Sequence, residues 1–393
     1  MAATQEILLQ QCSDLVSSEG ANFLVSPAIT PECTYQLGAD ARESPHNHVP
    51  YQRKDNTGKI LPNILEYIGN TPLVRLNSVP QLHGVKCEVL AKCEFLNPGG
   101  SIKDRIAHRM VLEAEKAGKV EAGCTLVEST AGNTGIGMAL VAAAKGYDCI
   151  ATIPDKFSGE KSKVMNALGA KILITPTGVP IGSPGCGWAV AQALPQKIQK
   201  CFYLNQFGSA GNALAHYDGT AEEILDQCDG KLDMMVIGAG SGGMMTGISR
   251  KLKEKLPDIE IVAADPCGSC LAPPEMNQSH ITCFSVEGIG RPDFVPTVCD
   301  RKLVDRWIKT SDRDSFRMAR EMMKKEGLLC GESSGALMCA AMQAAKRLKE
   351  GQRCVVILPD GITNYMSTLL DDGWMVKKGF HEMEDDEADE GNR

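Results

Sequence analysis

A glycine-rich segment at residues 238–243 is the first part of the chain whose residue types suggest a binding function. It reads Gly-Ala-Gly-Ser-Gly-Gly and lies between the apolar run 233–237 and the amphipathic stretch 244–255. Glycines let backbone N–H groups approach an anion closely, and the N-terminus of a following helix adds a favourable dipole. The segment also fits the G-x-G-x-x-G dinucleotide fingerprint, with Asp265 at about the expected distance. On this motif alone, a phosphate site, a dinucleotide site and a tight turn all remain open.

Two further loops carry polar residues at predicted strand-to-helix junctions. Residues 97–105 read N-P-G-G-S-I-K-D-R, which puts Lys103 at the start of a helix that we predict from about Asp104. Backbone donors and nearby cationic groups would lower the pKa of an amine there and favour the neutral nucleophile, although an exposed surface lysine fits the spacing as well. Residues 129–135 read S-T-A-G-N-T-G, and their hydroxyl and backbone N–H groups suit a carboxylate. A cluster of N-cap residues explains the same composition.

These loops need a scaffold, and the apolar pattern of the chain indicates one. Runs typical of buried strands lie at residues 87–92, 124–129, 148–153, 171–175, 233–239, 259–265 and 353–358. Helical patterns lie between them, for example at Asp104–Lys116, Ile136–Lys145, Lys161–Leu168 and Ser315–Glu326. The alternation predicts an α/β fold with parallel sheets that helices cover on both faces. Ligands bind such folds beyond the carboxyl ends of the strands, where all three loops lie.

Composition divides the chain into three regions and excludes several classes of function. Residues 1–57 are polar and lack periodicity, residues 58–380 carry the α/β pattern, and residues 381–393 form an acidic tail. Much of the net charge of −8 lies in this tail, so the nearly neutral body gives no support for a nucleic-acid ligand. No apolar run reaches the roughly 18 residues of a membrane helix. The N-terminus also lacks a secretory leader, so we expect a cytoplasmic protein whose 16 cysteines are reduced.

Together the three loops and the segment G-E-S-S-G-A at residues 331–336 resemble the fold-type II pyridoxal-phosphate enzymes, the family of cysteine synthase and cystathionine β-synthase. The resemblance extends from about Cys33 to Phe380 and is strongest to the cystathionine β-synthase branch, with long matching stretches such as EGQRCVVILPD. It implies two parallel-sheet α/β subdomains with pyridoxal 5'-phosphate between them. A dinucleotide site loses its support once all the loops are considered together.

The resemblance also implies roles for individual residues. Lys103 is the catalytic lysine, which links to the aldehyde of the cofactor and later moves protons at the substrate. The other expected contacts to the cofactor come from Asn133 at the phenolic oxygen, Ser333 at the pyridine nitrogen, and a phosphate cradle of Gly240, Ser241, Gly242, Gly243 and Met244. The substrate carboxylate is expected to contact Thr130, Ala131, Asn133, Thr134 and Gln206.

The polar N-terminal region resembles the haem-binding segment of animal members of this branch. Cys33 and His46 occupy the positions of the two axial ligands of the haem iron, and His48 is the alternative nitrogen ligand. A thiolate on haem needs electrostatic compensation, and Arg250 matches the arginine that supplies it. The resemblance therefore implies haem b as a second cofactor.

Several positions depart from the pattern of this family. Ala131 replaces a serine, Phe207 replaces a tyrosine, and Met244 replaces a threonine beside the phosphate loop. Arg291 and one extra residue stand where a tyrosine is expected after Gly290, and Glu332 stands where the family has glycine. These changes could weaken substrate binding or alter the choice of the second substrate.

The activity that the resemblance implies is condensation of L-serine with L-homocysteine to give L-cystathionine and water. A cysteine synthase that uses sulfide is the nearest alternative, and a haem- and cofactor-binding sensor or partner subunit with little turnover is the alternative from another class. We also expect a homodimer. No tandem regulatory module is expected after residue 380.

Overall fold

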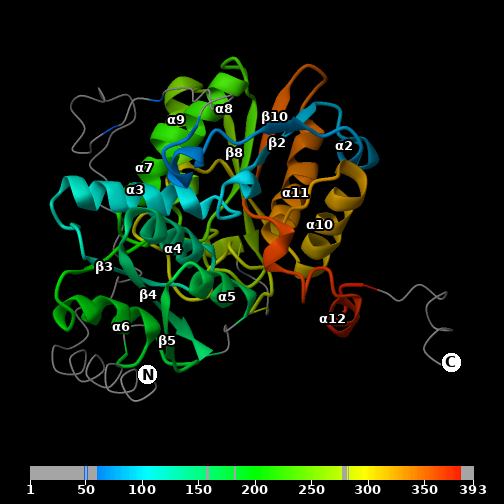
Figure 1. Ribbon diagram of the computed structural model, residues 1–393. Helices are drawn as coiled ribbons and strands as arrows, with labels where there is room; N and C mark the ends of the chain where they lie inside the picture. Colours follow the sequence, from blue (N-terminus) through cyan, green and yellow to red (C-terminus); the bar gives the residue numbers. More distant parts are fainter. Residues whose placement is uncertain are drawn as a thin grey trace.

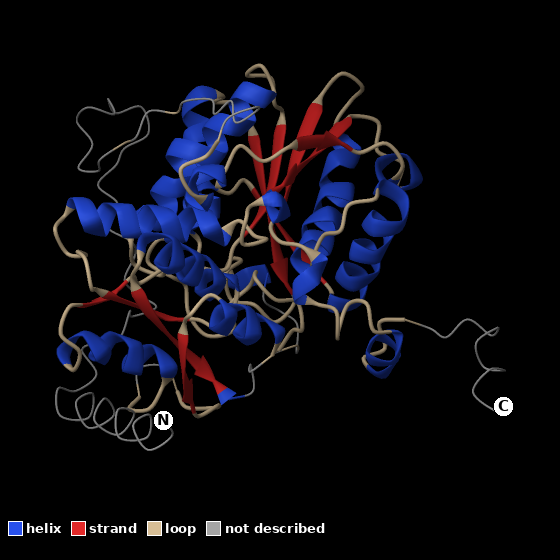
Figure 2. Ribbon diagram, viewed as in Figure 1, coloured by secondary structure: helices blue, strands red, loops and turns tan. Residues whose placement is uncertain are grey.

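The computed structural model describes His48, Tyr51 and residues 60–381, except 156–158, 181–182, 277–280 and 282. These residues form two β-sheets with helices packed around each (Figures 1 and 2). The N-terminal region 1–57 thus lies almost entirely outside the described residues, as does the acidic tail after His381.

The larger sheet has six strands in the order β1-β2-β10-β7-β8-β9. Every neighbouring pair is parallel except β1 with β2, so the sheet is parallel as predicted apart from one antiparallel pair at its edge. The strands are β1 (Leu73–Arg75), β2 (Glu88–Cys93), β7 (Met234–Gly238), β8 (Glu260–Pro266), β9 (Arg306–Thr310) and β10 (Arg353–Leu358).

Helices cover both faces of this sheet, as expected for buried parallel strands. Figure 1 shows α8 and α9 on one side of it and α10 and α11 on the other. These helices are α8 (Ala221–Gln227), α9 (Gly243–Lys255), α10 (Asp312–Glu326) and α11 (Glu332–Ala344). Shorter helices are α2 (Val79–Leu82), α7 (Ala210–Ala215) and α12 (Asp372–Lys377), and a π-helical turn, His216–Thr220, joins α7 to α8.

The smaller sheet has four parallel strands in the order β5-β4-β3-β6. They are β3 (Thr125–Ser129), β4 (Asp148–Pro154), β5 (Lys171–Thr175) and β6 (Cys201–Tyr203). In Figure 1, α3, α4 and α5 lie on one side of this sheet and α6 on the other. Their bounds are α3 (Lys103–Lys116), α4 (Asn133–Lys145), α5 (Glu160–Ala167) and α6 (Gly187–Ala193).

Close packing of α3 against α4 fixes the starts of both helices. A Cβ atom added at Gly137 would lie 3.0 Å from the carbonyl oxygen of Lys103 and 3.1 Å from the Cβ of Ala107. Glycine therefore lets α4 approach α3 beside the predicted catalytic lysine. Within the described residues, no helix is both long and apolar enough to span a bilayer.

Candidate active site

Four loops that follow strands converge between the two sheets. Lys103 lies beyond β2, the segment 129–133 follows β3, the glycine segment follows β7, and Asp360 lies just after β10. A backbone hydrogen bond of 2.8 Å from the amide of Ile102 to the carbonyl of Pro359 joins two of these loops. This is the location that the parallel strands predict for a ligand site.

Lys103 is the first residue of α3, one residue earlier than the predicted start of the helix. Burial lowers the pKa of its ammonium to about 8, while the negative charge of Asp360 opposes this shift. The cause is thus burial and not the neighbouring cations that the sequence suggested. No hydrogen bond from its Nζ is found within the described residues. A half-buried amine with a lowered pKa and no partner can serve as a nucleophile or base.

The glycine segment has little space for side chains. A Cβ at Gly240 would lie 2.5 Å from the carbonyl oxygen of Gly288, and Gly242 has a φ of +89° as the N-cap of α9. Ser241 accepts a hydrogen bond of 2.9 Å from Nδ2 of Asn212, and Met244 is buried in the core. The segment therefore presents bare backbone at a helix N-terminus, as a phosphate group requires.

The side chain of Asn133, at the start of α4, is held at both ends. Its Nδ2 donates to Oδ2 of Asp360 at 2.7 Å, and its Oδ1 accepts from Nδ2 of Asn364 at 2.9 Å. Since an amide nitrogen carries two hydrogens, one donor of Asn133 remains for a ligand. Asp360 and Asn364 are residues that sequence reasoning missed.

Ser333 lies in the first turn of α11, with 1% of its surface exposed. Its hydroxyl makes no hydrogen bond with another described residue. A Cβ added at Gly288 would be 3.7 Å from Oγ of Ser333. The backbone around Gly288 therefore lies next to both Gly240 and Ser333. The hydroxyl therefore lies near the glycine segment and can bind a ring nitrogen.

Glu332, the unexpected carboxylate beside Ser333, belongs to a separate hydrogen-bond network. Its Oε2 accepts from the amide of Glu287 at 3.2 Å, and its Oε1 accepts from the Thr368 hydroxyl at 3.1 Å. Burial raises the pKa of Glu332 to about 8. Lys161, from α5, pairs with Glu287 and lies 4.3 Å above the ring of Tyr365. These contacts connect α5, beside the smaller sheet, to the larger sheet.

The segment predicted to bind a carboxylate meets the loop after β6. Thr134 donates to Oε1 of Gln206 at 2.8 Å, and Oγ1 of Thr130 accepts from the amide of Gly132 at 3.1 Å. Beneath them, the Glu128 carboxylate accepts from the amide of Gln206 at 3.0 Å, and burial raises its pKa to about 8. Thr134 and Gln206 therefore contact each other, and Thr130 lies in the same segment as Thr134.

Three further departures from the family pattern are Ala131, Phe207 and Arg291. Ala131 is partly buried against the apolar core of the smaller sheet, and its methyl group offers no donor. The guanidinium of Arg291 lies 4.2 Å from the ring of Phe294 and 5.1 Å from that of Phe207. It also pairs with Asp293 at 2.9 Å. Phe207 thus forms part of an aromatic group that supports Arg291.

Asp265 does not fit the dinucleotide alternative. Its Oδ2 accepts from Nζ of Lys309 at 2.7 Å and from the amide of Ala272 at 3.0 Å. This carboxylate serves the loop after β8. Its other oxygen, Oδ1, has no hydrogen-bond partner among the described residues, but the residue is fully buried and presents no surface to a ribose hydroxyl.

The predicted haem ligands Cys33 and His46 lie outside the described residues. Nδ1 of His48 is 2.8 Å from Oδ1 of Asp218, and Arg250 pairs with Asp300 at 3.1 Å. Within the part of the chain that the structure describes, no group of three or more His, Cys, Asp and Glu residues is arranged to hold a metal ion.

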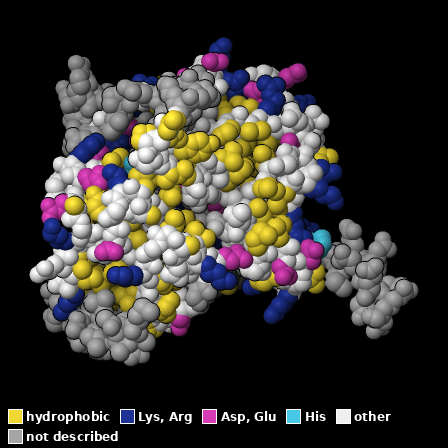
Figure 3. All heavy atoms as spheres, in the orientation of Figure 1, with side chains coloured by type: hydrophobic (Ala, Val, Ile, Leu, Met, Phe, Trp, Pro, Cys, Tyr) yellow, Lys and Arg dark blue, Asp and Glu magenta, His cyan; other side chains and the backbone are white. Residues whose placement is uncertain are grey.

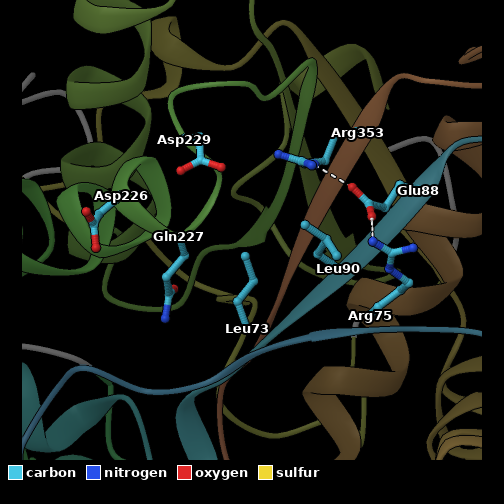
Figure 4. Close-up of a pocket in the computed structure, with 8 residues that line it drawn as sticks. All are labelled: Leu73, Arg75, Glu88, Leu90, Asp226, Gln227, Asp229 and Arg353. Atoms are coloured by element: carbon cyan, nitrogen blue, oxygen red, sulfur yellow. Dashed lines mark hydrogen bonds and ion pairs between the residues drawn. The ribbon is translucent and has the colours of Figure 1, made fainter.

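A separate pocket of about 470 Å³ opens beside β1, β2 and β10 (Figure 4). Glu88 lies between Arg75 and Arg353 and pairs with both, while Asp226, Gln227 and Asp229 face them from another segment. None of the predicted site residues lines this pocket.

Cys267 and Cys270, in the loop after β8, form a C-x-x-C pair that sequence reasoning overlooked. Both thiols are free, and burial raises the pKa of each.

The fold and the loop geometry define an α/β protein with a half-buried lysine between two sheets, and comparison with known proteins gives its family. The model of the family "Pyridoxal-phosphate dependent enzyme" matches residues 64–360. The chain belongs to this family, which confirms the predicted fold class.

Among curated relatives, cystathionine beta-synthase of Rattus norvegicus is 55% identical over 366 residues, covering 93% of this chain and 64% of that protein. Cystathionine beta-synthase of Apis mellifera is 51% identical over 348 residues, covering 88% of this chain and 68% of that protein. The solved structure of O-ureido-L-serine synthase matches with a TM-score of 0.74 and 33% identity, covering 84% of this chain and 99% of that one. The chain thus spans just under two thirds of the length of its rat relative.

Proposed function

We propose that this chain binds pyridoxal 5'-phosphate and condenses L-serine with L-homocysteine to L-cystathionine and water. The observation that carries the proposal is Lys103, a half-buried amine with a lowered pKa at the junction of the two sheets. The names of the similar proteins in rat and honeybee support the choice of substrates.

The residues present fit the cofactor. The bare backbone of the glycine segment suits its phosphate, the remaining donor of Asn133 suits its phenolic oxygen, and the hydroxyl of Ser333 suits its ring nitrogen. A hydroxyl in place of a carboxylate leaves that nitrogen uncharged, which favours elimination and replacement at the β-carbon. When bound, the cofactor supplies the electron sink that makes the α-proton of an amino acid acidic.

Lys103 would take the α-proton of serine and later return a proton to the α-carbon. The β-hydroxyl of serine leaves as water, and the homocysteine sulfur forms the new bond to the β-carbon. Thr130, Thr134 and Gln206 would hold the carboxylate of the amino acid, with neutral hydroxyl and amide groups only. The lowered pKa of Lys103 keeps a usable fraction of neutral amine near neutral pH.

The test compares Lys103→Ala with Lys116→Ala, an exposed lysine at the other end of the same helix. Purified protein is given serine and homocysteine, cystathionine is measured by mass spectrometry, and bound cofactor is measured by absorption. We expect Lys103→Ala to reduce turnover by roughly a hundredfold to ten-thousandfold, as for the loss of a positioned base. Lys116→Ala should behave as wild type. Normal cystathionine formation by Lys103→Ala would contradict the proposal.

The same assay distinguishes the alternatives. Product formed with sulfide but not with homocysteine would identify a cysteine synthase. A wild-type protein that binds the cofactor but does not respond to serine would be a binding or sensor protein.

We also propose haem b as a second cofactor, on the resemblance of residues 33–48 to a haem-binding segment. Cys33→Ala should lose a thiolate-type haem spectrum, and His46→Ala should lower haem content. Wild-type protein without haem absorbance after expression with a haem precursor would contradict this assignment.

A homodimer in the cytosol completes the proposal. Figure 3 shows apolar side chains gathered across the centre of one face, with charged groups toward its margins. Exposed apolar residues of the chain include Tyr67, Leu96, Leu329 and Met366. Light scattering during gel filtration would test the dimer, and a monomeric mass at micromolar concentration would contradict it.

A further inference from the structure

Asp360 is the residue on which the parts of the site converge. It forms a β-bridge with Ser101, two residues before Lys103, and its carbonyl accepts a 2.9 Å hydrogen bond from the amide of Gly331, two residues before Ser333. Its side chain is 1% exposed and reaches Asn133 from the other side. Three predicted cofactor contacts therefore lie next to Asp360, two through its backbone and one through its carboxylate.

The hydrogen bonds of Asp360 are unevenly distributed between its two oxygens. Oδ2 accepts from Asn133 and, at 2.6 Å, from the hydroxyl of Tyr365. Oδ1 is buried and has no hydrogen-bond partner within the described residues. A Cβ at Gly331 would lie 2.2 Å from this oxygen, so glycine leaves the space that it occupies. A buried oxygen without a hydrogen-bond partner costs free energy, so its retention here needs an explanation.

The bond to Asp360 also determines which end of the Asn133 amide faces it. A carboxylate accepts and never donates, so the Nδ2 end must point to Asp360 and the Oδ1 end to Asn364. Without Asp360, the amide could rotate and present its oxygen where a donor is needed.

The charges around Asp360 come from several elements. Lys103 of α3 and Lys161 of α5 are the cations that interact with it, while Glu287, Cys330 and Tyr365 are its titratable neighbours. Burial raises the pKa of Asp360, and the bonds from Tyr365 and Asn133 oppose this shift because they favour the ionised form. The carboxylate in turn favours the charged form of Lys103.

We propose that Asp360 is the positioning residue of this site: it orients the Asn133 amide toward the cofactor and places its carboxylate near Lys103. The inference deepens the proposed function and rests on it for the identity of the cofactor. Asp360 touches neither cofactor nor substrate in this scheme and acts through Asn133 and Lys103.

The first test measures the titration of Lys103 directly, in full-length protein from which cofactor has been removed. Acetic anhydride labels neutral amines, and mass spectrometry of the Lys103 peptide across a pH series gives the pKa of this residue. Asp360→Asn removes the charge and keeps the shape, so the pKa of Lys103 should fall. A fall of about one pH unit would raise labelling at pH 6.5 roughly tenfold.

Glu332→Gln is the control for changing a buried acid beside the site: with a pKa of about 8, Glu332 is already mostly protonated at pH 6.5, so the substitution alters its bonds to Glu287 and Thr368 without removing a charge. In Glu332→Gln, the pKa of Lys103 should be the same as in wild type. If Asp360→Asn does not fold, Tyr365→Phe removes one of the two donors to Oδ2 and should lower the pKa of Lys103 by less.

The second test measures the affinity for pyridoxal 5'-phosphate. Losing the oriented donor of Asn133 should weaken binding roughly tenfold to a hundredfold, the effect of one lost charge-assisted hydrogen bond. Because Asp360 acts through Asn133, the double variant Asp360→Asn/Asn133→Ala should bind no more weakly than Asn133→Ala alone.

Unchanged labelling of Lys103 together with unchanged cofactor affinity in Asp360→Asn would overturn the inference. Additive losses in the double variant together with unchanged labelling of Lys103 would also overturn it, since Asp360 would then act through neither residue. A wild-type protein that never binds pyridoxal 5'-phosphate would instead overturn the proposed function, while the labelling result would still report on Asp360 and Lys103.

Discussion

At the scale of single residues, the departure at Ala131 has a measurable consequence. Its methyl group packs against the core of the smaller sheet, so the loop that we propose for the substrate carboxylate lacks one hydroxyl. A charge-assisted hydrogen bond is worth about 1.5–3 kcal/mol, which corresponds to roughly tenfold to a hundredfold in affinity. We therefore expect Ala131→Ser to tighten serine binding by up to this factor and to leave cofactor binding unchanged.

The measurement is a titration of the bound cofactor's absorption with serine. Ala117→Ser, at the exposed C-terminal end of α3, is the control and should not change the titration. Arg291 is a weak candidate for compensating the missing hydroxyl, because its guanidinium already pairs with Asp293 and stacks on Phe294. A wild-type protein that saturates at low serine, with no gain in Ala131→Ser, would show that the carboxylate is held differently.

Sequence reasoning located the site residues that carry a motif and missed those that act through packing. Lys103, Asn133 and the glycine segment follow predicted strands, and the structure places all three between the two sheets. Asp360 and Lys161 belong to no motif, and Glu128 is an ordinary residue of a strand. Their roles arise from burial and from partners more than seventy residues away, as in the bond between Glu128 and Gln206.

At the scale of elements, a buried ion network anchors α3 to its neighbours. The guanidinium of Arg105 donates to Glu94 after β2 and to Glu223 of α8, both at 2.6 Å. Glu223 also pairs with Lys92 of β2 at 2.7 Å. All four side chains are buried, and Arg105 lies two residues after Lys103. The network therefore fixes the start of the helix that carries the proposed catalytic lysine.

Arg105→Leu should lower the free energy of unfolding by about 3–5 kcal/mol, because it leaves two carboxylates buried with one cation between them. Urea unfolding followed by circular dichroism measures this change. Arg75→Leu is the matched control, since Arg75 is 67% exposed and pairs with Glu88 at the surface. Arg75→Leu should lower the free energy of unfolding by about 1 kcal/mol or less. Equal losses in the two variants would contradict the anchoring role.

The elements themselves were predictable where burial makes a strand continuously apolar. All seven predicted strands are present, including β7 and β10 at the centre of the larger sheet. The prediction missed β1, β6 and β9. The first two have three residues each, and β9 has the sequence R-W-I-K-T, whose charged positions interrupt the apolar run. Strands at sheet edges, such as these three, are only partly buried and carry a weaker signal.

At the scale of the whole molecule, the buried acids make stability depend on pH in an unusual direction. Burial raises the pKa of Glu128 and Glu332 to about 8 and that of Asp104 to about 7. In the unfolded chain these groups titrate near pH 4, so between about pH 5 and 8 the folded state binds more protons. The free energy of unfolding should therefore fall as pH rises through this range.

Two buried bases limit this effect to a defined window. Burial lowers the pKa of His216, so below about pH 6.5 this residue makes the free energy of unfolding rise with pH, opposite to the effect of the buried acids. Lys103, with a pKa of about 8, loses its proton earlier in the folded state than in the unfolded chain. Lys103 therefore makes the free energy of unfolding rise with pH above about pH 8. The fall should be clearest between about pH 6.5 and 8.

Glu332→Gln provides the test, because it removes one of the groups that cause the fall. Each group that stays protonated in the folded state contributes up to about 1.4 kcal/mol per pH unit, so the variant should flatten the slope by up to this amount. Urea unfolding at several values between pH 6.5 and 8 gives the slope. Glu121→Gln, at a glutamate whose side chain is 69% exposed, should leave it unchanged. A free energy of unfolding that rises through this window in wild type would mean that these carboxyls are ionised in the folded protein, and that the cations around them outweigh their burial.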